Sequence, residues 1–275
     1  MIDHLIAIVP AHNEEAEIIG CLTALVAAAE HAQTGEPAQA DEQAQAGKAG
    51  SGAVTSRPPA VRIVAIADDC SDSTAGLIRG FAARHPLVTP MVVPFGNVGR
   101  ARDAAAHAAL RTIAEADPGA LAATWLAFTD ADSRVPVNWL TAHRDHALRG
   151  ADCVVGTVEP RRTPGTGALV DAWFAGHSLG EGHEHVFGAN LGIRGSLFTR
   201  IGGCPPLRLG EDAALVAAAA EAGGTIHRTD DCRVVTSARM HGRCHGGFSA
   251  YLRGLVAESG SDRLGEDPVD DLRTG

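Results

Sequence analysis

Short apolar runs alternate with longer alanine-rich runs over the first 160 residues. A short apolar run is typical of a buried strand, whereas apolar positions repeated at helical spacing are typical of a helix. Strand–helix alternation of this kind predicts an α/β fold, a Rossmann-like and mostly parallel sheet with helices on both faces. We expect strands at 4–10, 61–68, 87–94, 124–130 and 151–159, and helices at 15–32, 74–85, 99–116 and 136–148.

The pattern becomes less regular in the second half. We expect residues 161–258 to extend the sheet formed by residues 1–160, and residues 259–275 to form a polar tail. Residues 33–59 are rich in Gly, Pro, Ala and Gln, which predicts a long flexible insertion. The expected elements of the second half are helices at 167–178, 210–224 and 246–259, and short strands at 225–229 and 233–239.

The composition argues against several classes of binding partner. The formal net charge is −10 with no basic block, which argues against nucleic acid or an anionic membrane as the main partner. No apolar run approaches the ~18–20 residues of a membrane span, and the N-terminus lacks the basic region of a signal peptide. The six cysteines lack CxxC spacing, so we expect free thiols in a reducing cytoplasm. The oligomeric state stays open, a homodimer included.

Acidic residues follow three of the expected strands. Asp130 and Asp132 come directly after an apolar run, Asp68 and Asp69 follow another, and Asn13 and Glu14 follow the first strand. The ends of parallel strands meet at one edge of a sheet, which is where ligands bind. Helix capping explains an acid such as Asp72, but two carboxylates one residue apart repel unless they share a proton or bind a cation. We therefore expect a divalent cation and a diphosphate at this edge.

The order of these motifs resembles the family 2 glycosyltransferases of the GT-A fold over most of residues 4–255. The motifs are IVPAHNEE (8–15), AIADDCSDST (65–74), GNVGRARDAA (96–105), FTDADS (128–133) and GEDAAL (210–215). The resemblance implies a GT-A sheet with a C-terminal acceptor-side extension. It also implies inverting transfer of a sugar from a nucleotide-diphosphate-sugar, such as a UDP- or GDP-sugar, to an unidentified hydroxyl acceptor.

The resemblance assigns residues 1–160 to nucleotide-sugar binding. Within this half, Asp69 would accept a hydrogen bond from the base, for a pyrimidine from its N3–H, and Asp130 would contact ribose or sugar. The complete set of implied donor-binding residues is Pro10, Ala11, Asn13, Glu14, Asp69, Asn97, Gly99, Arg102 and Asp130.

The resemblance assigns residues 161–258 to the acceptor and the catalytic base. Asp212 would be the general base, with Glu211 beside it, and a Mn²⁺ or Mg²⁺ ion would be the cofactor. Asp132, Asp130 and His245 would hold the metal. The implied acceptor-binding residues are His183, His185, Asn190 and Arg243.

Two departures from the family pattern affect this interpretation. Ser133 stands where many members have a third acid, so metal binding needs a further partner from residues 239–245. The QxxRW signature of processive synthases is absent, which favours a single transfer. Two alternatives remain: a sugar-phosphate nucleotidyltransferase, whose Gly-rich first loop is missing here, and a non-catalytic sugar-nucleotide binding protein, which would not need the Glu211–Asp212 pair.

Overall fold

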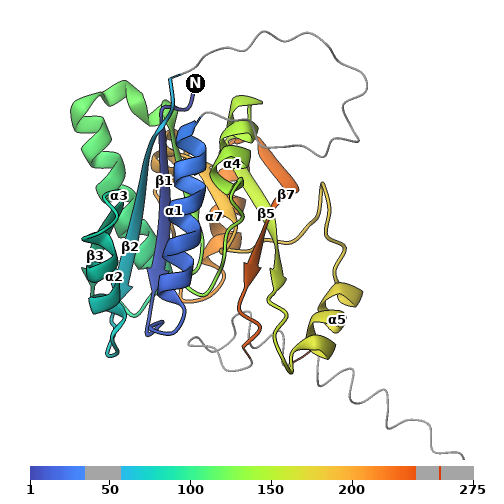
Figure 1. The fold of residues 1–275 in the computed structure, drawn as a ribbon. Helices are drawn as coiled ribbons and strands as arrows, with labels where there is room; N and C mark the ends of the chain where they lie inside the picture. The colour runs from blue at the N-terminus through green and yellow to red at the C-terminus, as the bar shows by residue number, and fades with distance from the viewer. Residues whose placement is uncertain (35–56, 240–253, 255–275) are drawn as a thin grey trace, which may run out of the picture.

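The computed structural model describes residues 1–34, 57–239 and 254, and within them a single sheet has the order β3-β2-β1-β4-β6-β5-β7 (Figure 1). Strand β6 runs antiparallel to β4 and β5, whereas the other neighbouring pairs are parallel. The mostly parallel sheet predicted from the sequence is confirmed. The strands are β1 His4–Ala11, β2 Ala60–Asp68, β3 Val88–Val93, β4 Thr124–Phe128, β5 Cys153–Pro160, β6 Leu191–Arg194 and β7 Ile226–Thr236.

Helices cover both faces of this sheet, as Figure 1 shows for α1 and α4 on one face and α7 on the other. Each face packs into its own apolar core, with small alanines such as Ala28 and Ala105 letting helices approach the strands closely. The helices are α1 Ile18–Thr34, α2 Thr74–Ala82, α3 Val98–Ala116, the 3₁₀ helix η1 Pro118–Ala123, α4 Trp139–Leu148, α5 Gly167–Gly176, α6 Gly195–Arg200 and α7 Glu211–Glu221.

The second half departs from the sequence prediction at β7. We expected two short strands separated by the polar residues 230–232, but one strand runs through them. The polar side chains are accommodated at an irregularity between Gly156 and Val158 of β5, where Asp230 accepts hydrogen bonds from Thr157 and Arg233. The short helices η1 and α6 were not predicted. The expected helix at 246–259, the tail, and most of the insertion lie outside the described residues.

Strand register brings the first three acidic loops to one edge. Ala11 at the end of β1 is paired with Ala67 of β2, and Ile8 of β1 is paired with Phe128 at the end of β4. The Thr129 amide continues this ladder by donating to the Ile8 carbonyl at 3.1 Å. The loops after β1, β2 and β4 therefore leave the sheet side by side, at the edge that the sequence indicated.

A buried polar network joins α4 to the strands of the second half. His143 is fully buried, its Nδ1 accepts from the Trp125 indole at 3.4 Å, and its Nε2 lies 3.3 Å from Asn190 Oδ1. This geometry requires a neutral ring with the proton on Nε2. Burial lowers the pKa of His143 to about 4, because charging the ring inside the core is unfavourable.

We expect this histidine to destabilise the fold in acid. The unfolded chain binds a proton near the ordinary histidine pKa of 6.5, whereas the folded chain resists it until about 4, so stability is lost as the pH falls through this interval. At pH 4.5 the expected loss is about 2.5 kcal/mol. Urea unfolding at pH 7 and pH 4.5 should therefore show a smaller pH dependence for His143→Gln than for the wild type. Equal pH dependence in the two proteins would contradict a neutral buried His143.

Candidate active site

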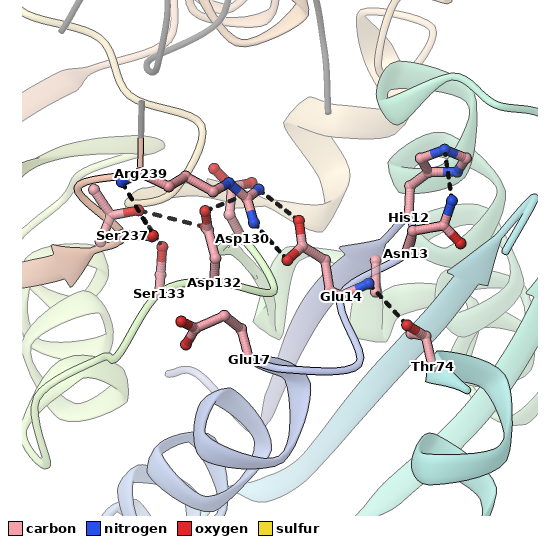
Figure 2. Close-up of polar contacts among 12 residues, drawn as sticks. His12, Asn13, Glu14, Glu17, Thr74, Asp130, Asp132, Ser133, Ser237 and Arg239 are labelled. Carbon is pink, nitrogen blue, oxygen red and sulfur yellow. Dashed lines mark hydrogen bonds and ion pairs between the residues drawn. The ribbon is translucent and has the colours of Figure 1, made fainter. Parts of the chain in front are cut away.

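The loop after β1 is fixed to the loop after β2 by Asn13. Its side-chain oxygen accepts hydrogen bonds from the backbone amides of Ser71 and Asp72, at 2.8 and 3.2 Å, and its own backbone has a positive φ of 54°. Asparagine tolerates this left-handed conformation better than most residues. The Glu14 amide in turn donates to the Thr74 hydroxyl at 2.8 Å (Figure 2). These hydrogen bonds fix the two loops to each other beside Pro10 and Ala11.

The adjacent acids Asp68 and Asp69 have different surroundings. Asp68 is buried, and its carboxylate accepts the backbone amides of Phe95, Gly96 and Asn97 at 2.7, 2.9 and 2.9 Å. It therefore fixes the loop that begins α3. Asp69 is exposed, with a positive φ of 50°, and points its carboxylate toward solvent near Gly96. Only the second acid of the pair remains available to a ligand.

A shallow hollow of about 240 Å³ lies beside Asp69. Its lining is apolar apart from Asp69 and the thiol of Cys70, which suits the flat face of a nucleobase with one polar contact at the rim. The remaining lining residues are Ala67, Ala75, Val92, Val93 and Pro94.

The start of α3 packs closely against the segment that leads to α7. Asn97 caps the helix by accepting the Arg100 amide at 2.9 Å, and its side-chain amide donates to the Pro206 carbonyl at 3.1 Å. A Cβ on Gly99 would lie 2.1 Å from the Pro205 carbonyl oxygen, so only glycine fits. Both residues thus have structural tasks here, and the donor contacts predicted for them stay predictions.

Asp132 and Glu14 share one arginine, Arg239, as Figure 2 shows. The guanidinium donates to both Glu14 oxygens at 2.6 and 2.5 Å, and its Nη2 lies 3.1 Å from Asp132 Oδ2. Burial raises the pKa of Asp132 to about 7, although Arg239 acts in the opposite direction. Ser133 is buried and donates to the Thr236 hydroxyl at 2.9 Å, which secures this loop to the end of β7.

These contacts test whether the residues fit a divalent cation. No group of three or more His, Cys, Asp or Glu side chains suited to a metal occurs within the described part of the chain. Asp132 and Glu14 nevertheless converge on a single positive charge, the Arg239 guanidinium. Magnesium and manganese are commonly held by one or two carboxylates plus substrate phosphates and water, so Asp132 fits a metal that arrives with a diphosphate. The predicted third ligand, His245, lies outside the described residues, as does Arg243.

Arg102 connects the first acid of the DxD motif to the acid pair of α7. It is 2% exposed, and its guanidinium donates to Asp130 Oδ1 at 2.6 Å, to Glu211 Oε1 at 2.6 Å and to the Gly188 carbonyl at 2.9 Å. The donor contact predicted for Arg102 stays a prediction, but its polar groups already bind three parts of the protein.

At the start of α7, as in the Asp68–Asp69 pair, the first acid is buried and bound to the protein and the second is more exposed. Glu211 is 6% exposed and bound to Arg102, and burial raises its pKa against the influence of that arginine. Asp212 is partly exposed, and among the described residues its carboxylate has one hydrogen bond, which Oδ1 accepts from the neighbouring Ala213 amide at 2.8 Å. A second oxygen is thus left for a substrate, which favours Asp212 as the base.

Two of the four predicted acceptor residues are buried. Asn190 is fully buried, and its amide donates to the Thr157 and Cys232 carbonyls while its oxygen accepts from Trp139. His183 is 7% exposed, with Nε2 at 3.1 Å from the Val155 carbonyl. Both ends of the Asn190 amide are thus bound within the protein, whereas His183 Nδ1 is buried without a hydrogen-bond partner among the described residues. The acceptor-binding roles predicted for both residues stay predictions. His185 is half-buried and remains a candidate.

Arg239 is the first of residues 239–245, from which the sequence predicted a further partner for the metal, but the carboxylates that it binds were not predicted. Glu14 and Arg239 are separated by 225 positions, and nothing in the local pattern signals the pair. The available signal was the TSAR stretch at 236–239, which follows an apolar strand. If this strand is parallel to β1, β2 and β4, its end lies at the same edge as their ends.

Comparison with known proteins agrees with this geometry. Residues 53–175 match the family model described as "Glycosyl transferase family 2". S. aureus TarS 1–349 in complex with UDP-GlcNAc has a TM-score of 0.57 at 13% identity, over 94% of this chain and 71% of that chain. The mannosyltransferase PcManGT from Pyrobaculum calidifontis, in complex with GDP-Man and Mn²⁺, has a TM-score of 0.55 at 19% identity, over 96% and 65%. These matches confirm the resemblance and the fold expected from the sequence.

Three further findings concern the length of the match, the curated proteins and the membrane. The chain matches 44% of the length of another TarS structure, and a search of curated proteins gave no match. In the part of the chain that the structure describes, no helix has the length and apolar character needed to cross a membrane.

Proposed function

We propose that the chain, whose residues 53–175 match the glycosyl transferase family 2 model, is a metal-dependent, inverting glycosyltransferase. Its donor would be a nucleotide-diphosphate-sugar and its acceptor a hydroxyl group. One observation supports this best: the exposed Asp69, the Asp132–Glu14 pair and the partly exposed Asp212 all stand at the carboxyl edge of the sheet. PcManGT, whose structure contains GDP-Man and Mn²⁺, has the same fold.

In the proposed reaction, residues of this chain hold the donor in three places. Asp69 accepts an N–H of the base, whose ring lies in the neighbouring hollow. Asp132, helped by Glu14, would hold the metal, and the metal would supply positive charge to the leaving diphosphate. Asp130 contacts the ribose or sugar, and its Oδ1 is fixed by Arg102.

Asp212 then takes the proton of the acceptor hydroxyl at Oδ2. The hydroxyl oxygen bonds to the anomeric carbon, the bond from that carbon to the diphosphate oxygen breaks, and the diphosphate leaves with the electron pair. Attack opposite the leaving group inverts the configuration. A base on α7, an element separate from the diphosphate side, is consistent with this direction of attack.

A thermal-shift screen of UDP-, GDP- and dTDP-sugars with Mn²⁺, followed by an assay of transfer, tests the proposal. A donor at 100 times its Kd should stabilise the fold by about 2.7 kcal/mol. Asp69→Asn should weaken the binding about tenfold or more, since it removes a charged acceptor from the base. Asp117→Asn, which keeps a capping side chain at the opposite edge of the sheet, is the matched control. Stabilisation by no nucleotide-sugar would overturn the proposed function.

A further inference from the structure

Arg102 is buried where four separate parts of the site meet. It belongs to α3, and it binds the DxD loop through Asp130, the segment before β6 through the Gly188 carbonyl, and α7 through Glu211. A Cβ on Gly188 would lie 2.5 Å from Arg102 Nη1, so the glycine makes room for the guanidinium. An arginine presents its donors in a rigid fork, which fixes the relative positions of the groups that it binds.

The partners of Arg102 serve opposite sides of the proposed reaction. Asp130 belongs to the donor side, whereas Glu211 is directly followed by the proposed base Asp212. Gly210, with a positive φ of 76°, turns the chain into α7 just before this pair. Glu211 has one oxygen bound to Arg102 and is buried, so it anchors the first turn of α7 and Asp212 moves with it.

We propose that Arg102 is a positioning residue that sets the distance between the donor-binding loop and the catalytic base by binding Asp130 and Glu211 together. In this role Arg102 acts through these two carboxylates and needs no contact with the substrate. Glu211 is the anchor of the base and takes no proton from the acceptor. The inference rests on the proposed function.

Arg194 provides a matched control. It is also an arginine that binds a carboxylate, Asp152, at 3.0 Å, and it donates to the carbonyls of Ala122, Ala147 and Ala151. It lies in β6 and pairs with Trp125 of β4, toward the edge opposite the site. Arg194→Gln therefore reports what losing a structural arginine does to stability and activity.

The kinetic experiment compares Arg102→Gln, Arg102→Lys and Arg194→Gln at a temperature where all three are folded. We expect Arg102→Gln to lower kcat about 100-fold with a change in donor KM below about threefold, since misplacing a catalytic group mainly affects the chemical step. Arg102→Lys should recover part of the loss, because one amine still reaches one carboxylate. A kcat for Arg102→Gln as high as that of Arg194→Gln would overturn the inference.

Hydrogen exchange provides a readout that needs no turnover. The Ala214 amide donates to the Gly210 carbonyl at 3.0 Å in the first turn of α7. It should exchange about tenfold faster in Arg102→Gln and in Glu211→Gln than in the wild type, but not in Arg194→Gln. Unchanged exchange in Arg102→Gln would also overturn the inference. If the wild type transfers no sugar while this exchange pattern holds, the proposed function fails and the positioning of α7 by Arg102 stands.

Discussion

Replacing Asp212 by Asn should lower the rate of sugar transfer by about 10²–10⁴ while leaving nucleotide binding unchanged. The asparagine has nearly the same shape, but it cannot accept the proton that the acceptor hydroxyl must lose. Asp212 is the suitable acid because it is partly exposed and keeps one oxygen without a bond to the helix start. Transfer is measured at saturating donor, and nucleotide binding by calorimetry.

Stability should change little in this variant. Asp212 lies in the first turn of α7, where its charge interacts favourably with the helix dipole by about 0.3–1 kcal/mol. Asp117→Asn, which alters an acid at the start of a different helix, should retain full activity. Transfer by Asp212→Asn at the wild-type rate would show that another group is the base, and Glu211→Gln would be the next variant to assay.

The fold could be predicted because its determinants are local. Apolar runs such as 61–68 are bounded by polar turns, and the alternation with helices leaves few topologies. The prediction of two strands in place of β7 was wrong because contacts with residues outside the local sequence decide the structure there. Residues 230–232 look like a break when taken alone, but Asp230 is satisfied by Thr157 and Arg233, so the strand continues through it.

The roles of adjacent acids could be predicted only in part. The sequence shows two acids at the end of a strand, but their different surroundings follow from the backbone, because Asp68 is the last residue of β2 and Asp69 has a positive φ. That Asp68 binds the backbone of the loop at 95–97 depends on a loop 27 positions further along the chain. Likewise, the burial of Asn190 follows from the packing of α4, β5 and β7 around it, which no local pattern reveals.

The charge balance at the carboxyl edge could not be predicted at all. Arg239 and Arg102 each bind two acids from distant parts of the chain. In the sequence, each arginine has closer charged neighbours than the partners it binds. The sequence predicted a divalent cation at this acidic edge, and that stays a prediction; the positive charges that contact its acids in the structure are those of Arg102 and Arg239.

This arrangement leads to the second prediction, that Asp132 and Arg239 affect metal binding in opposite directions. Asp132→Asn should weaken Mn²⁺ binding and reduce Mn²⁺-dependent transfer by about 100-fold, because a carboxylate ligand is lost. Arg239→Gln should strengthen Mn²⁺ binding in the absence of nucleotide by about tenfold or more. It removes a positive charge that lies 3.1 Å from Asp132 and 2.5 Å from Glu14, so a metal ion bound to these carboxylates would no longer have a like charge beside it.

Both effects can be measured by titrating the protein with Mn²⁺ and following free Mn²⁺ by electron paramagnetic resonance. Arg161→Gln is the matched control: Arg161 is as exposed as Arg239 and binds Glu17 at 2.6 Å, close to the same edge, but it forms no ion pair with Asp132 or Glu14 among the described residues. It should leave Mn²⁺ affinity within about twofold of the wild type, since a more distant charge interacts more weakly with the metal. Weaker Mn²⁺ binding by Arg239→Gln would mean that the arginine supports the metal site instead of competing for it. Unaltered binding by Asp132→Asn would remove Asp132 from the metal site, and with it the reason for two acids at the end of β4.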